Sequence, residues 1–405
     1  MKVTVYILTT IALAGILPGS ACASPRVQRC YRLAYHNIPQ DVRHMLMVVR
    51  FARWHPGEVY WFTGTRRRDL VLHLANVQGT YVRKMVLAIK VRATDLQIDS
   101  RFSTSLTMAP NGRYLAYERE GHLSVYSLRR KTIRRIATVT GLHMTPMIFS
   151  PHGNRLVFVQ AHHLYLYSLR RKRRPKLLFP SLLFSSGWPW PVTWVSRNTA
   201  VINPDVLGRD GQTYSALTLG LINLKTGSVR VLWKIPPLHG GIFPVAYSKS
   251  SHRLFFGYGG ISHEVFEVAT LRNRRLIHAR KIMVTPPDAI LTGIDIDSVS
   301  ANGVYITYRL YNGRSHGYLK NIDTGRSVCF SNEGLSVSGP MISPGVRFIM
   351  VFVNPPPPTI TMAILARVAR IPVSVLRRID RKRPLRPVSA SGRRWTGRRS
   401  SPGRA

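Results

Sequence analysis

The sequence predicts an all-β protein, a six- or seven-bladed β-propeller of four-stranded antiparallel blades. One observation is a repeat, in which two segments of a first copy return in a second: Ala109–Tyr117 as Ser150–Phe158, and Leu123–Lys131 as Leu164–Lys172. The other is the spacing, because Pro110 and Pro151 lie 41 residues apart. A period of about 40 to 45 residues containing short alternating strands is typical of a propeller blade.

The chain begins like a secretory signal, and residues 1–23 are expected to be removed. Lys2 forms a short basic region, Val3–Leu17 is apolar, and Ala21-Cys22-Ala23 has the small-x-small pattern of a cleavage site. Lipidation of Cys22 and retention of the leader as an anchor are the alternatives. We therefore expect a secreted or otherwise extracytoplasmic protein, in the periplasm or at the cell surface. No membrane span is expected after cleavage, because a span needs about 20 apolar residues.

Residues 24–56 are interpreted as a separate N-terminal segment. The apolar residues of Asp41–Trp54 recur at roughly helical spacing, which indicates a short helix. Cys30–Tyr35 alternates instead, and it is a candidate for the strand that completes the last blade.

Cleavage of the leader would leave two cysteines, Cys30 and Cys329. An even pair of cysteines in an oxidising compartment is a candidate disulfide. Two unrelated buried thiols are the alternative.

The propeller is expected to span residues 57–380. Each clear copy consists of an inner strand, a Pro-x-Gly turn, a second and a third strand, a basic turn and an outer strand. Asn111-Gly112 and His152-Gly153 supply the positive φ that tight turns require. Weaker copies contain Trp194–Ile202, Tyr247–Phe256, Ser300–Tyr308 and Ser343–Val351. Counting Glu58–Ile89 gives seven units, and omitting it gives six.

The pattern Ser-Pro-x-Gly-x-x-Leu, followed by Leu-x-x-Tyr-x-Leu, resembles the TolB-like propeller repeat, which is related in layout to WD-repeat propellers. The resemblance covers roughly Glu58–Arg378 and implies the propeller fold. At the turn between the third and fourth strands the family usually has Asp-x-x-Thr-Gly, whereas the two clearest copies have Arg-Arg-Lys.

The chain carries 59 Lys and Arg against 17 Asp and Glu, a formal net charge of +42. Such an imbalance favours anionic partners. Because the first and third hairpin turns of a blade share a face, neighbouring blades should join their basic turns into a cationic arc. A compositional bias is the alternative, since Arg is scattered over the whole chain. The candidate binding residues are Arg129, Arg130, Lys131, Arg170, Arg171, Lys172, Arg173 and Arg174.

Residues 381–405 are rich in Arg, Pro, Ser and Gly and nearly without apolar residues. Such a composition cannot offset the entropy lost on ordering, so the segment is interpreted as a disordered basic tail.

Signals for catalysis or metal binding are weak. Gly313–Gly317 matches the Gly-x-Ser-x-Gly of a nucleophile elbow, but its context is a β-hairpin and no histidine follows it. Asp295 and Asp297 alternate along an expected inner strand and, with Asp288, form a candidate site for a hard cation such as calcium. A polar channel lining is the alternative. No cofactor is expected.

These observations predict an exported, non-catalytic propeller that serves as a binding scaffold for a protein or an anionic envelope polymer. It is expected to be a monomer and not an enzyme. The alternatives are a propeller hydrolase with channel carboxylates and an Arg-rich nucleic-acid binder, against which export argues.

Overall fold

The computed structural model describes residues 30–381 apart from a set of gaps. The longer gaps are 38–44, 91–105, 139–146, 179–191, 208–212, 236–240, 285–293, 332–336 and 354–364. The shorter ones are 56, 66–68, 79, 81, 120, 162, 172–173, 204, 216–217, 261–262 and 313. Residues 1–23 and 382–405, for which a signal peptide and a disordered tail are predicted, lie outside the described part.

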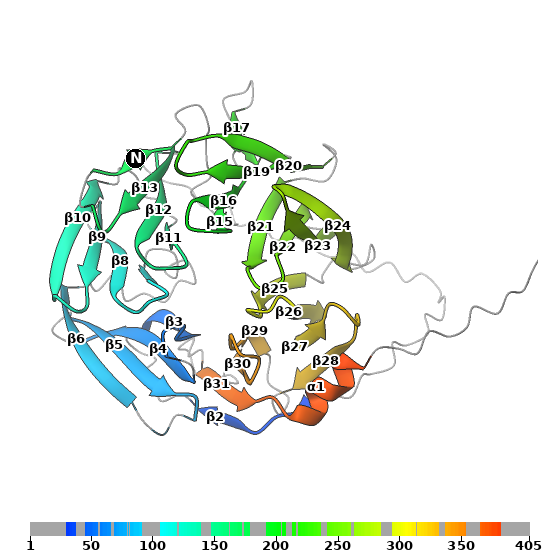
Figure 1. Ribbon diagram of the computed structural model, residues 1–405. Coiled ribbons are helices and arrows are strands. Elements are labelled where there is room, and N and C mark those ends of the chain that lie inside the picture. Colours follow the sequence, from blue (N-terminus) through cyan, green and yellow to red (C-terminus); the bar gives the residue numbers. More distant parts are fainter. Residues whose placement is uncertain are drawn as a thin grey trace, which may run out of the picture.

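Antiparallel blades stand side by side in a ring, as the sequence predicts, and of the predicted six or seven blades the structure has seven (Figure 1). Blade 1 consists of β3 (Met45–Phe51), β4 (Glu58–Gly64), β5 (Asp69–Asn76) and β6 (Val82–Lys90). Blade 2 consists of β7 (Leu106–Met108), β8 (Tyr114–Arg119), β9 (His122–Ser127) and β10 (Thr132–Thr138). Blade 3 consists of β11 (Met147–Phe149), β12 (Arg155–Gln160), β13 (His163–Ser168) and β14 (Lys176–Leu177).

The remaining blades follow the same order. Blade 4 consists of β15 (Val192–Trp194), β16 (Thr199–Ile202), β19 (Thr218–Asn223) and β20 (Val229–Lys234), with a hairpin of β17 (Asp205–Leu207) and β18 (Thr213–Ser215) inserted. Blade 5 consists of β21 (Gly241–Ser248), β22 (Arg253–Gly260), β23 (His263–Arg272) and β24 (Arg275–Val284). Blade 6 consists of β25 (Ile294–Val299), β26 (Tyr305–Asn312), β27 (Arg314–Asn321) and β28 (Ser327–Ser331). Blade 7 begins with β29 (Val337–Ile342), β30 (Phe348–Val353) and β31 (Leu365–Arg370).

Each blade buries its apolar faces against its neighbours. The described core residues form seven clusters, and each cluster joins two adjacent blades. Between blades 2 and 3, for example, Leu123 and Val125 pack with Leu156 and Phe158. The second strand β12 is buried along its centre, whereas the outer strand β10 is largely exposed and carries charged residues. A single blade therefore cannot shield its own apolar surface, and the closed ring is the stable unit.

The N-terminal residues close the ring. Strand β2 (Tyr35–Asn37) pairs antiparallel with β31 and becomes the outer strand of blade 7. Strand β1 (Tyr31–Arg32) pairs parallel with β28 at the edge of blade 6, where a disulfide joins Cys30 to Cys329. The last blade thus combines one strand from the N-terminal part of the chain with three from the C-terminal part, and the described residues before 57 contain three strands.

The helix predicted over Asp41–Trp54 is wrong, because β3 occupies Met45–Phe51 as the inner strand of blade 1. Its register against β4 shifts between Met45 and Met47 and again between Met47 and Arg50. Two irregularities in seven residues break the two-residue alternation of a strand, so the apolar spacing resembles that of a helix.

The helix that does form, α1 (Val373–Asp380), follows β31 and packs on blade 6. The helix residues Val375 and Ile379 are buried against the blades. The Asp380 carboxylate accepts hydrogen bonds from the Tyr305 hydroxyl at 2.7 Å and from the Asn321 amide at 2.9 Å. Among the described residues, no helix has the length and apolar character that crossing a membrane requires.

Candidate anion-binding face

One backbone hydrogen bond recurs in every blade and sets the geometry of one face of the ring. The amide that follows the third strand, or in blade 5 the amide of Leu271 near the end of that strand, donates to the carbonyl immediately before the second strand. In blade 3, Leu169 N donates to Asn154 O at 3.1 Å, and in blade 4, Leu224 N donates to Asn198 O at 2.8 Å. The first and third turns of each blade therefore lie on the same face, as the sequence predicts.

This bond also aligns the seven blades residue by residue. We call the residue that follows the donor the turn position. The residue that follows the acceptor opens the second strand, and we call it the strand position. From blade 1 to blade 7 the turn positions are Gln78, Arg129, Arg170, Lys225, Arg272, Asp323 and Pro372. The strand positions are Glu58, Tyr114, Arg155, Thr199, Arg253, Tyr305 and Phe348.

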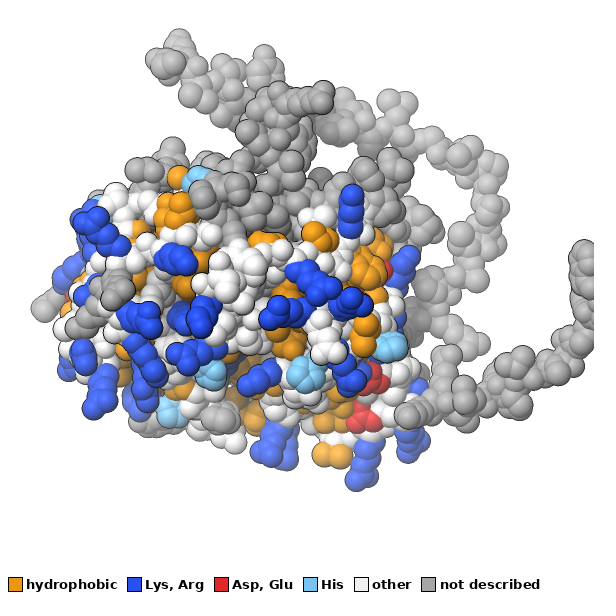
Figure 2. All heavy atoms as spheres, turned by 45° about the horizontal axis from the view of Figure 1, so that its top comes forward, with side chains coloured by type: hydrophobic (Ala, Val, Ile, Leu, Met, Phe, Trp, Pro, Cys, Tyr) orange, Lys and Arg blue, Asp and Glu red, His pale blue; other side chains and the backbone are white. Residues whose placement is uncertain are grey.

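Four successive blades, 2 to 5, carry a basic residue at the turn position. Arg129, Arg170, Lys225 and Arg272 are all exposed. On the side of the molecule that Figure 2 shows, Lys and Arg side chains are spread over much of the surface and few acidic side chains appear. The face is distinguished by the regular placement of its cations at equivalent positions, not by their density alone.

At the junction of blades 5 and 6, the strand and turn positions form an ion pair. The Arg253 guanidinium contacts both carboxylate oxygens of Asp323, at 2.7 and 3.1 Å, and donates to Gly303 O at 3.0 Å. Arg280 adds a further contact to Asp323 at 3.0 Å. Planar, two-pronged pairing of this kind is the strongest arrangement for arginine and a carboxylate.

We expect Arg253→Leu to lower the free energy of unfolding by about 1 kcal/mol, because it removes the ion pair with Asp323. The loss is not larger because Asp323 is partly exposed and solvent screens the pair. Urea denaturation at low and high salt measures the change. Arg280→Leu, which removes only the single-contact partner, serves as the comparison and should have the smaller effect. Equal stability of Arg253→Leu and the unchanged protein at low salt would show that the ion pair of Arg253 and Asp323 does not stabilise the fold.

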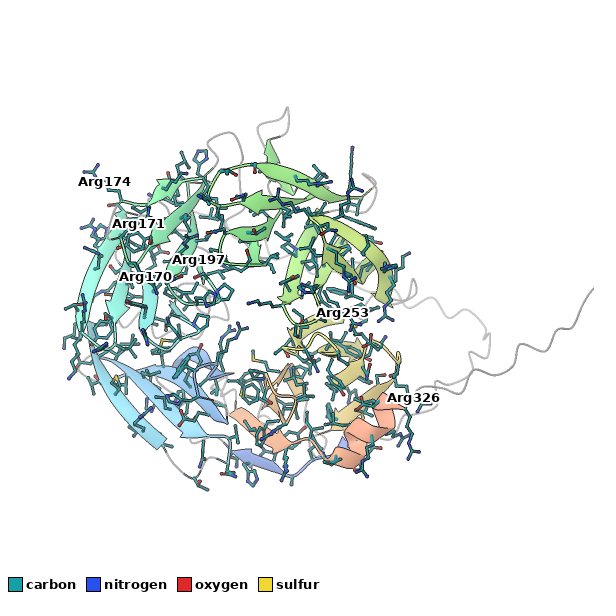
Figure 3. All side chains as sticks on the ribbon, viewed as in Figure 1. Arg170, Arg171, Arg174, Arg197, Arg253 and Arg326 are labelled. Carbon is teal, nitrogen blue, oxygen red and sulfur yellow. A yellow bond between two sulfur atoms is a disulfide. The ribbon has the colours of Figure 1, made fainter. Side chains whose placement is uncertain are left out.

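At the junction of blades 3 and 4, the same two positions are both basic. Arg155 donates to Arg197 O at 3.0 Å and to the Asn198 side-chain oxygen at 2.9 Å. Lys225 stands where blade 6 has Asp323. Burial, followed by the positive charges of Arg197 and Arg171, lowers the pKa of Arg155. Figure 3 labels Arg170, Arg171 and Arg174 on blade 3 and Arg197 on blade 4.

The candidate binding residues can be placed in this frame. Arg129, Arg130 and Lys131 occupy the turn of blade 2, and Arg170, Arg171 and Arg174 occupy that of blade 3, all exposed. Lys172 and Arg173 lie outside the described residues. Sequence reasoning missed Arg155, Arg197 and Lys225. Aligning the weaker fourth copy on its Thr-Gly turn would have revealed Lys225 as the counterpart of Asp323.

The candidate cation site is described only at one residue. The Asp297 carboxylate pairs with Arg309 at 3.0 Å, at a register shift between Ile296 and Ser298. This irregularity interrupts the alternation on which the site was predicted. Asp288 and the side chain of Asp295 lie outside the described part.

Two other patterns are resolved by the strand arrangement. Ser315, the central residue of the elbow-like Gly313–Gly317, lies in β27 opposite Tyr311 in a hairpin. It therefore lacks the strand-turn-helix geometry of a nucleophile elbow. Cys30, His316 and Cys329 place their ligand atoms within 4.8 Å of one another, but the two sulfurs are bonded to each other and offer no thiolate.

Solved structures with the same architecture share little sequence with this chain. An oligogalacturonate lyase in complex with manganese has a TM-score of 0.54 at 11% identity, covering 86% of this chain and 99% of that chain. An oligogalacturonate lyase from Vibrio parahaemolyticus has a TM-score of 0.53 at 10% identity, covering 86% and 99%. The Cps50 (Swd1) β-propeller domain of Myceliophteria thermophila has a TM-score of 0.53 at 13% identity, covering 83% and 98%.

These likenesses show a seven-bladed propeller fold. No family model and no curated protein matches the chain, so the TolB-like resemblance extends to the fold alone. The comparison overturns the prediction that the chain is not an enzyme, because two of the similar structures are enzymes built on the same propeller. Since one fold serves both lyases and a propeller domain such as Cps50, the fold did not justify excluding catalysis.

Proposed function

We propose that this propeller binds an acidic polysaccharide outside the cytoplasm, through the face that carries the basic turns. The observation that carries the proposal is the run of exposed cations at equivalent turn positions in blades 2 to 5, Arg129, Arg170, Lys225 and Arg272. Neighbouring blades repeat the same position around the ring, so the cations form a row. A row of charges suits a polymer that carries an anionic group on each unit.

Export favours a polysaccharide over a nucleic acid as the partner. The disulfide between Cys30 and Cys329 is consistent with an extracytoplasmic protein, because such bonds persist in oxidising compartments. The predicted leader supports the same location. Two of the proteins with a similar structure are oligogalacturonate lyases, and galacturonate is an acidic sugar.

The test is binding of polygalacturonate compared with neutral dextran, measured by calorimetry at low and near-physiological salt. We expect polygalacturonate to bind and salt to weaken it, because exposed charges are screened over a Debye length of about 8 Å. Replacing Arg129, Arg170 and Arg272 with Ser should weaken binding on the order of tenfold, a loss of roughly 1.4 kcal/mol.

A matched variant separates position from total charge. Arg83→Ser, Lys84→Ser and Lys234→Ser remove the same number of exposed cations from outer strands of blades 1 and 4. This control should bind almost as well as the unchanged protein. Equal losses in both triple variants would show that attraction by overall charge is enough, and would overturn the proposal. Equal binding of neutral dextran would do the same.

A second candidate function is cleavage of such a polymer, favoured by the two lyases among the similar structures. It is tested by incubating the protein with oligogalacturonate, with and without added manganese, and analysing the products by mass spectrometry. Shorter, unsaturated products support a lyase. Recovery of intact oligomer under both conditions, with binding retained, contradicts it.

A further inference from the structure

We propose that the junction of blades 3 and 4 is a carboxylate-binding site, in which a ligand carboxylate takes the place that Asp323 occupies between blades 5 and 6. The site consists of Arg155, Lys225, Arg171 and Arg197. The inference rests on the proposed function and deepens it by naming the group of the polysaccharide that is recognised, the carboxylate of a uronic acid.

The two junctions are equivalent in backbone geometry. Lys225 N donates to the Asn223 side-chain oxygen at 2.9 Å, as Asp323 N donates to that of Asn321 at 2.8 Å. Two residues later each turn has a glycine at positive φ, 82° at Gly227 and 70° at Gly325. Lys225 and Asp323 therefore occupy the same place in the same turn.

The arginines that face these turns are equivalent as well. Arg155 and Arg253 each open the second strand of their blade. Each donates through Nη1 to the carbonyl two residues before the next blade's second strand, Arg197 O at 3.0 Å and Gly303 O at 3.0 Å. Lys225 follows Arg155 by 70 residues, the same separation that joins Arg253 to Asp323.

Two features differ between the junctions. One is Asn198, whose side-chain oxygen accepts a hydrogen bond from Arg155 Nη1 at 2.9 Å where Asp323 accepts one from Arg253 Nη1 at 3.1 Å, so a ligand carboxylate would meet the Nε and Nη2 donors of Arg155. The other is charge. Of the seven pairs of strand and turn positions, Arg155 and Lys225 is the pair in which both residues are basic. Arg171 and Arg197 add positive charge, and within the described residues no carboxylate forms an ion pair with any of these four. Burial first, and then the positive charges of Arg197 and Arg171, lower the pKa of Arg155, so these two arginines act on its guanidinium. An anion placed here would relieve their mutual repulsion.

The chemistry of the site fits a carboxylate. A guanidinium offers parallel N–H donors that match the two oxygens of a planar carboxylate, and the protein uses this pairing at Arg253 and Asp323. Lys225, exposed at the turn position, adds a compact positive charge. Arg170 and Arg272, at the turn positions on either side of Lys225, extend the cationic row along which further sugars would lie.

The deciding variant is Lys225→Asp, which supplies the carboxylate that the junction lacks. We expect its affinity for oligogalacturonate to fall about tenfold or more, since the new side chain would occupy Arg155 itself. Without ligand its thermal midpoint should rise, while the shift produced by oligogalacturonate should disappear. Lys234→Asp, at the far end of β20, changes the net charge equally and should lower the affinity less than about threefold.

The outcomes distinguish the site from the proposed function. If Lys225→Asp binds oligogalacturonate as well as the unchanged protein while the triple serine variant does not, the junction is not the site and the function stands. If the unchanged protein does not bind it, both fail. Dextran sulfate serves as a probe that carries sulfate groups in place of carboxylates. If Lys225→Asp no longer binds dextran sulfate but binds oligogalacturonate as well as the unchanged protein, the junction does not recognise a carboxylate. Should Lys225→Asp fail to fold, Lys225→Ala must show a smaller loss of affinity in the same direction.

Discussion

Removal of the disulfide between Cys30 and Cys329 is expected to lower the free energy of unfolding by as much as about 5 kcal/mol, because the bond closes a very long loop. The two residues are 299 positions apart. Strand β1, which the bond fixes to blade 6, pairs with β28 over only two residues, and Arg378 contacts its Tyr31 hydroxyl at 2.6 Å. The bond therefore ties the start of the chain to the sheet beside the closing blade.

Guanidinium denaturation of the oxidised protein and of a Cys30→Ala, Cys329→Ala variant measures this effect. The oxidised protein should unfold at the higher concentration. Reductant should lower the stability of the unchanged protein and leave the variant unaffected. Identical midpoints for the oxidised protein and the variant would contradict the expected contribution.

Phe256→Ala is expected to lower the free energy of unfolding by about 3–5 kcal/mol, because it opens a cavity in a fully buried cluster. Phe256 has no exposed surface, lies in the cluster between blades 4 and 5, and packs beside Trp233 with ring centroids 5.6 Å apart. Since each blade depends on its neighbours, the loss should shift the unfolding of the whole ring and not of one blade.

Val231→Ala in β20 is the matched control, since 63% of the surface of Val231 is exposed. It should change stability by less than about 0.5 kcal/mol. Circular dichroism and intrinsic fluorescence should report one common transition for Phe256→Ala. A separate early transition would show that blades unfold independently.

Much of the fold can be predicted from the sequence, because the Pro-x-Gly turns and alternating strands repeat at a regular interval. Blades 2 and 3 are predicted nearly strand for strand. The choice between six and seven blades is settled by blade 1, whose second strand opens at Glu58. The inner strand of blade 1 could not be predicted, because its register shifts hide the alternation of β3. Helix α1 follows the last repeat and has no counterpart in it.

The candidate site is predictable only in part. Runs such as Arg129–Lys131 are visible as clusters, and their common face follows from the order of strands in a blade. The junction of Arg155 and Lys225 depends on two residues far apart in the chain that neighbouring blades bring to equivalent places. This junction stands out only when it is compared with Arg253 and Asp323, where the same positions form an ion pair. Repetition in the structure thus supplies a comparison that a single copy of the repeat lacks.

A crystal structure of the protein with a galacturonate oligomer tests the central claim most directly. The account predicts a sugar carboxylate within hydrogen-bonding distance of the Arg155 guanidinium and the Lys225 ammonium, with neighbouring sugars running toward Arg170 or Arg272. An oligomer bound on the opposite face of the ring would contradict this account. So would an oligomer bound on the face of the basic turns without contact to Arg155 and Lys225.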